Sequence, residues 1–103
     1  MRILTYHPFI LKAKEQCIKI SPEKEEYFEH LEKLIREHPE TGIPDSCLLS
    51  NGKIIRCYKK AIKVYLFSGR IRYERSQITA QYFFNDKVIR ILIFIFQLSG
   101  VKK

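Results

Sequence analysis

Residues 91–96, with the sequence ILIFIF, place six apolar side chains in a row near the end of the chain. Successive side chains of a β-strand point to opposite faces, so a strand built from this run is apolar on both faces. Such a strand belongs inside a sheet that is covered on both sides, not at a solvated edge. The run is also far shorter than the roughly 18 residues of a membrane-spanning helix. We therefore expect a buried interior strand and no membrane segment.

Strict alternation along this strand predicts two sets of side chains on opposite faces: Ile91, Ile93 and Ile95 on one, Leu92, Phe94 and Phe96 on the other. One set is expected to pack against a helix. The other set requires a curled sheet, a second copy of the chain or a partner chain, because large exposed apolar patches are uncommon on monomers.

A helix is predicted from Ser21 to about Glu37 or His38. Ser21 is a good N-cap residue, and Pro22 suits the first helical position. Pro39 disfavours helical backbone at the residue before it. Spacings of one, three, three and one place five residues on a single apolar face: Tyr27, Phe28, Leu31, Leu34 and Ile35.

A shorter helix is predicted from Pro8 to about Gln16, after a strand at residues 2–6. Ile18 and Ile20 follow it and are open to an alternative, extended interpretation. Both helices fall within the first 40 residues.

After Gly42 the hydrophobic period changes from helical to extended, and three turn signals follow: Asn51-Gly52, Ser68-Gly69 and Asn85-Asp86. The sequence therefore predicts an α+β fold in which one or two N-terminal helices pack on a three- to five-stranded antiparallel sheet. The sheet is expected over residues 47–98, and the chain of 103 residues is expected to form a single domain.

Charge is distributed unevenly along the chain, whose formal net charge is +8. Residues 21–45 carry eight acidic and three basic side chains, whereas residues 52–90 carry ten basic and two acidic ones. Such asymmetry favours a polyanion or an acidic protein as partner of the second half, with a merely solvated basic face as the alternative. The candidate nucleic-acid-binding residues are Lys53, Arg56, Lys63, Arg70, Arg72, Tyr73, Arg75 and Lys87.

No catalytic or metal site is predicted. Arginine is a poor base, so a basic cluster indicates binding more than catalysis. His30 and His38 lie on one side of the predicted helix and could supply a base, although a helix-surface histidine is more often only solvated. The cysteines, Cys17, Cys47 and Cys57, are odd in number and widely spaced, which favours reduced thiols in a cytoplasmic protein over a disulfide framework or a zinc site. We expect no cofactor and no signal peptide.

Three segments resemble parts of the RelE/ParE superfamily of bacterial toxins. "LEKLIREHPETGIP" is similar to its second helix and the exit from it, "GKIIRCY" to its first strand after the helices, and "ITAQYFFNDKVIRILIFIF" to its final hairpin. The order of a strand, one or two helices and a basic sheet also resembles that superfamily.

The resemblance implies a cytoplasmic toxin that acts on translation by cleaving mRNA, or on another nucleic-acid machine. It implies RNA or the ribosome as target and an acidic or amphipathic antitoxin-like protein as partner. If the chain is an enzyme, it would be a metal-independent endoribonuclease. Thr79 and Gln97, however, stand where the nuclease branch usually has basic residues, which argues against cleavage. The alternative is a non-catalytic basic module that binds RNA, DNA or an acidic protein.

Overall fold

The computed structural model describes residues 2–102, which form two helices, a short 3₁₀ turn and six strands. In chain order these are β1 (Ile3–Tyr6), α1 (Pro8–Ile20), α2 (Lys24–Glu37), η1 (Pro39–Thr41), β2 (Ile43–Leu48), β3 (Ile54–Ser68), β4 (Ile71–Phe84), β5 (Val88–Gln97) and β6 (Val101–Lys102). Neither of the two helices in this part of the chain is long and apolar enough to span a membrane.

The strands form one sheet in the order β1-β5-β4-β3-β2, with β6 pairing β4 beyond the end of β5. The α+β class is as predicted, but the antiparallel sheet is wrong. β1 runs parallel to β5, with Ile3 opposite Val88 and Tyr6 opposite Ile91, so the sheet is mixed. β2 to β5 are joined by three hairpins and are therefore antiparallel to their neighbours, whereas α1 and α2 separate β1 from β2 in the chain, so no hairpin constrains the direction of β1. The sheet also extends beyond the predicted residues 47–98, because it includes β1, β2 begins at Ile43, and β6 lies at Val101–Lys102.

Both predicted helices are present, with changed ends. α1 continues through Ile18 to Ile20, so the extended interpretation of these residues is wrong, and the Ser21 N–H caps the helix on the Cys17 carbonyl at 2.9 Å. Because Ser21 ends α1, α2 begins two residues after Pro22, at Lys24. It ends at Glu37 as predicted.

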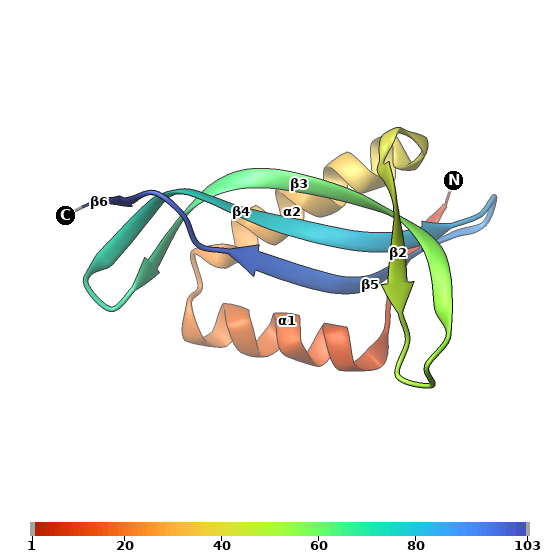
Figure 1. Ribbon diagram of the computed structural model, residues 1–103, viewed down its shortest axis with the longest axis horizontal. Helices are drawn as coiled ribbons and strands as arrows, with labels where there is room; N and C mark the ends of the chain where they lie inside the picture. The colour runs from red at the N-terminus through yellow and green to blue at the C-terminus, as the bar shows by residue number, and fades with distance from the viewer. Residues whose placement is uncertain (1, 103) are drawn as a thin grey trace.

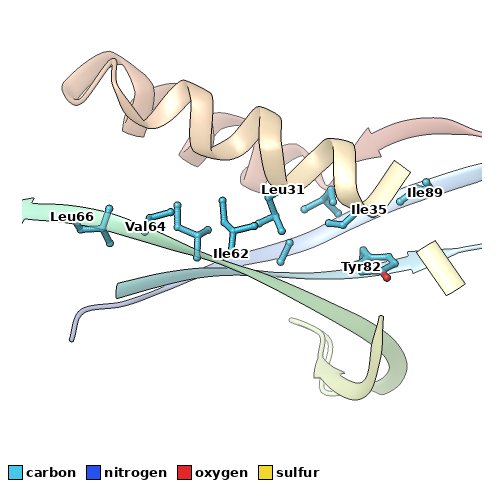
Figure 2. Packing of buried hydrophobic residues seen from close by; sticks show 10 residues of the cluster. Leu31, Ile35, Ile62, Val64, Leu66, Tyr82 and Ile89 are labelled. Atoms are coloured by element: carbon cyan, nitrogen blue, oxygen red, sulfur yellow. The ribbon is translucent and has the colours of Figure 1, made fainter. Parts of the chain in front are cut away.

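The core lies between α2 and one face of the sheet (Figure 2), which we call the covered face. Leu31 and Ile35 point from α2 onto side chains of β3, β4 and β5, and all of these are buried. β3 contributes Ile62, Val64 and Leu66 to this core, and they alternate with exposed residues as the period of a half-covered strand requires. Cys57, nearer the start of β3, is also buried but lies outside this cluster.

A β-bulge at Leu92 changes which residues of the ILIFIF run face the helices. Gln81 pairs with Ile93 and the next residue, Tyr82, pairs with Ile91, so Leu92 is the extra residue of β5. Ile91 is therefore buried with Leu31, while the Phe94 and Phe96 rings lie 4.9 and 6.0 Å from the Phe28 ring between centroids.

The two predicted sets are consequently mixed, and the strict alternation is wrong. Ile91 and Phe94 face the helices, whereas Leu92, Ile93 and Ile95 line hollows on the opposite face of the sheet. We call that face the open face.

The open face is partly covered by the chain itself. Figure 1 shows β3 curving strongly at its first residues, so that β2 crosses in front of the other strands while α2 lies behind them. A curled sheet is one of the three ways, with a second copy and a partner chain, in which the second face of ILIFIF was expected to be covered. This curl leaves hollows on the open face, which are described below.

An ion pair between α1 and α2 lies close to the core. The Lys14 Nζ is 2.6 Å from the Glu32 Oε1, and these side chains are only 16% and 12% exposed. The same ammonium donates to the Tyr6 hydroxyl of β1 at 3.0 Å. Burial, and then the neighbouring Glu32 carboxylate, raise the pKa of Tyr6. One lysine thus joins three elements.

Candidate nucleic-acid interface

The open face of β3 carries exposed aromatic and basic side chains. Because Ile62, Val64 and Leu66 point to the covered face, Lys63, Tyr65 and Phe67 point to the open one. Tyr65 is 53% exposed and Phe67 is 59% exposed, although both rings belong to a paired sheet strand, near its hairpin end. With Arg70 and Arg72 these three residues form what we call the basic aromatic surface.

Arg72 is held over one of these rings. Its register partner on β3 is Phe67, and its guanidinium carbon lies 4.9 Å from the centroid of the Tyr65 ring, a cation–π arrangement. Its Nε is also 3.6 Å from the Glu74 Oε1, in a pair that is well exposed. The basic aromatic surface therefore holds the Arg72 guanidinium in place beside two exposed rings, those of Tyr65 and Phe67.

The eight predicted residues do not form one cluster. Lys53 and Arg56 lie at the start of β3 and Lys87 in the turn between β4 and β5, at the opposite end of the sheet from Arg70. A 15-residue strand spans roughly 50 Å at 3.3 Å per residue, and the molecule is 45 Å long. Lys53 and Lys87 therefore lie far from Arg70, at the other end of the molecule.

Five of the eight lie along β3 and β4 toward the β3–β4 hairpin. Lys63 and Arg72 are on the open face, and Arg70 is in the turn that follows Gly69. Tyr73 pairs with Leu66 and is half-buried toward the covered side. Arg75 is exposed and lies against the tail, since a Cβ on Gly100 would be 2.7 Å from its Nε.

A polar hollow of about 320 Å³ adjoins the basic aromatic surface on the open face. The two are continuous, because Lys63 pairs with Gln77, which lines the hollow and donates to the Gln97 side chain. The lining residues are Ile43, Asp45, Lys59, Lys60, Ala61, Gln77, Thr79, Gln81, Ile95 and Gln97.

Among the described residues, Asp45 is the one carboxylate that lines this hollow. A backbone hydrogen bond from Ser46, followed by one from the Gln81 amide at 2.8 Å, lowers the pKa of the Asp45 carboxyl. The Lys59 ammonium lies 3.8 Å from the same carboxylate. A carboxylate with a lowered pKa is a poor general base near neutral pH.

Thr79 and Gln97, the two departures from the nuclease branch, both line this hollow. β4 and β5 bring them within two residues of each other in register, since Gln77 pairs with Gln97 and Thr79 with Ile95. The hollow is accordingly rich in neutral amides. Its cations, within the part of the chain that the structure describes, are Lys59 and Lys60, and Lys60 directs its ammonium to the Leu34 carbonyl on the covered side.

The histidines do not supply a base there. His30 and His38 are on α2 and its C-cap, on the far side of the sheet, and His38 pairs with Glu40 at 3.3 Å. Nor do three or more metal-ligating side chains converge anywhere within residues 2–102.

The predicted site residues omitted several residues of this interface. The alternation in "AIKVYLF" nevertheless predicts that Lys63, Tyr65 and Phe67 share a basic and aromatic face, and the exposure of Tyr65 and Phe67 beside buried aliphatic residues confirms that pattern. Nothing in the sequence singles out Gln77 and Gln81, because an isolated amide on a strand is common and only the fold brings these two into one hollow.

Comparisons with known proteins add nothing to this geometry: no family model, no curated protein and no solved structure matches the chain.

Proposed function

We propose that this protein binds single-stranded nucleic acid, RNA foremost, through the basic aromatic surface and the adjoining polar hollow. The observation that carries the proposal is the pair of exposed rings, Tyr65 and Phe67, flanked by Lys63 and Arg72 on one open sheet face. Sequence-tolerant binding of single strands combines stacking on aromatic rings with cationic contacts to the backbone.

The hollow supports binding without cleavage. Metal-free RNA hydrolysis requires a base for the 2′-hydroxyl, an acid for the leaving oxygen and a cation for the charged transition state. Asp45 is engaged with Gln81 and Lys59, and neither helix histidine reaches the hollow. The Gln77 and Gln81 amides each donate one hydrogen bond within the hollow, and their carbonyl oxygens and second N–H groups are suited to hydrogen-bonding the edges of unstacked bases.

Removing Lys63 and Arg72 together is expected to weaken binding of a short single-stranded RNA and to flatten its dependence on salt. For single strands, the slope of log K against log salt should fall by about 0.7 for each phosphate group that the variant no longer neutralises. Replacing Tyr65 and Phe67 with alanine should weaken binding by about 1–3 kcal/mol per stacked base without this change of slope. Fluorescence anisotropy at several salt concentrations measures both effects.

The matched control is the double variant Lys53→Ala/Lys87→Ala, which also removes two positive charges but at the other end of the sheet. It should bind almost as the parent does. Equally weakened binding in the two double variants would mean that the net positive charge alone, and no particular surface, attracts the RNA.

A second proposal follows from the order of the elements. The structure has a strand, two helices and then the sheet strands β2 to β6 with a basic hairpin, and the resemblance to RelE/ParE toxins rests on a similar order. We propose that the RNA-binding surface serves a toxin of a bacterial toxin–antitoxin module, in the cytoplasm, with an acidic or amphipathic antitoxin-like protein covering it. A fold hosts many functions, so this proposal needs its own test.

Induced expression in a bacterial host is expected to arrest growth, and the Lys63→Ala/Arg72→Ala variant is expected to relieve the arrest at equal protein level. Primer extension on host mRNA separates two outcomes. Arrest with intact mRNA supports a toxin that binds without cleaving, whereas new mRNA ends would identify a nuclease. Normal growth of cells that accumulate the parent protein would reject the toxin and leave the binding module.

A further inference from the structure

An apolar groove of about 480 Å³ lies on the open face, at the end of the sheet away from the basic aromatic surface. Its walls come from three places: the β2–β3 hairpin, strands β4 and β5, and the first turn of α1. The apolar lining residues are Phe9, Ile10, Leu48, Leu49, Ile55, Phe83, Leu92 and Ile93. Two features create this groove. The bulge at Leu92 directs the Leu92 and Ile93 side chains toward it, and the curl of β3 places the β2–β3 hairpin over these side chains.

The size of the groove suits a small molecule. Ligand sites have volumes of roughly 300–1,000 Å³ and are mostly apolar with a few polar groups. One turn of an α-helix with its side chains, about 10–12 Å wide and 5.4 Å long, already occupies roughly 400–600 Å³. The groove would therefore hold about one helical turn, too little to anchor a partner helix.

Among the described residues, Arg90 is the one with a permanent charge that lines the groove. It lies between Thr5 of β1 and Phe83 of β4 in register, and no carboxylate within residues 2–102 pairs with it. Two other polar groups of the groove already have hydrogen-bond partners in neighbouring residues. The His7 Nδ1 accepts from the Phe9 N–H at 3.3 Å, and the Asn51 Oδ1 accepts from the Lys53 N–H at 3.0 Å. A guanidinium beside apolar walls is complementary to an anionic group on an apolar body.

We propose that this groove binds a small anionic amphiphile, with an alkyl or aromatic body against Leu92 and Ile93 and a single anionic group at Arg90. The proposal does not depend on nucleic-acid binding, because the groove and the basic aromatic surface share no residue.

The test is a series of straight-chain carboxylates from hexanoate to dodecanoate, kept below their micellar concentrations and titrated by calorimetry. Affinity should rise about fourfold for each added methylene until the groove is full, as burial of a CH₂ group predicts. The neutral alcohols of the same length should bind more weakly than the carboxylates, and Arg90→Gln should abolish that difference while leaving alcohol binding unchanged. Decyl phosphate in place of decanoate distinguishes a phosphate from a carboxylate head.

Leu48→Asp tests the wall of the groove. Leu48 is 70% exposed, so the variant should fold, yet a charge at the rim should reduce decanoate affinity at least tenfold. Ile20→Asp is the matched control, because Ile20 is 80% exposed at the far end of α1 and does not line the groove, and it should bind decanoate as the parent does.

Three results would overturn the proposal. These are an affinity that does not grow with chain length, a carboxylate preference that survives in Arg90→Gln, and a Leu48→Asp variant that binds decanoate as well as Ile20→Asp does. Absence of binding by dodecanoate at roughly millimolar concentration, the weakest affinity of interest, would overturn it as well.

Discussion

Replacing Lys14 with methionine is expected to lower the free energy of unfolding by about 3 kcal/mol, the low end of the range for a buried ion pair that loses one partner. The methionine retains the apolar length of the lysine, so the destabilisation arises mainly from the Glu32 carboxylate. That carboxylate remains nearly buried between the two helices with no ammonium at 2.6 Å. The Tyr6 hydroxyl also loses its donor. Urea unfolding followed by circular dichroism measures the effect.

Two further variants identify the cause. Lys33→Met removes the exposed pair with Glu37, whose N–O distance is 3.9 Å, and should cost less than about 0.5 kcal/mol. Lys14→Met/Glu32→Leu replaces the buried pair with apolar groups and should recover most of the stability. If Lys14→Met costs no more than Lys33→Met, the pair is solvated and does not hold α1 to α2.

Replacing Gly42 with alanine is expected to cost about 2–3 kcal/mol, as overpacking of a filled site does. The Gly42 φ of −64° is open to any residue, so backbone strain is not the reason. A Cβ there would clash with the Tyr82 hydroxyl and lie 2.9 Å from the Tyr58 Cβ. Tyr82 cannot easily withdraw, because its hydroxyl donates to the buried Pro39 carbonyl at 2.6 Å. Thermal unfolding of the two proteins gives the difference.

A double-mutant cycle with Tyr82→Phe locates the clash. Burial raises the pKa of Tyr82 to about 12, so its hydroxyl remains protonated and keeps its hydrogen bond near neutral pH. Removing that hydroxyl should itself cost about 1–3 kcal/mol but make Gly42→Ala less costly than in the parent. Gly52→Ala is the contrast: it has open space and a φ of +84°, so its cost of about 1–2 kcal/mol is backbone strain that Tyr82→Phe should not change.

The helices and turns could be predicted because their signals are local. Pro8 begins α1 and Pro39 follows α2, and each acts on its immediate neighbours. The turns at Asn51-Gly52 and Asn85-Asp86 are likewise set by residues inside them, and the Asn85 Oδ1 accepts from the Lys87 and Val88 N–H groups.

The direction of β1 and the bulge at Leu92 could not be predicted. A strand of four residues has the same apolar pattern whether it pairs parallel or antiparallel. A bulge shifts the following side chains to the opposite face of the sheet. In a strand that alternates apolar and polar residues, this shift is visible as a break in the alternation, but in ILIFIF every position is apolar and no break can be seen.

The distribution of the candidate site residues over the fold could not be predicted from the sequence. The excess of basic residues after Gly52 indicated an anionic partner, which stays a prediction, but charge counting treats Lys53 and Arg70 as neighbours in one block. The 15 residues of β3 hold them apart. The polar hollow depends on pairing between β4 and β5 and on the position of β2, which no local pattern encodes.

The parallel pairing of β1 with β5 has a consequence for the order in which the chain can fold. Residue 3 finds its partner at residue 88, whereas β2 to β5 are joined by short turns and can associate locally. Closing so long a loop costs conformational entropy, and the contacts that offset this cost exist only after the rest of the sheet has formed. During synthesis β1 therefore leaves the ribosome well before its partner β5, and its pairing completes this edge of the sheet after the hairpins from β2 to β5 have formed.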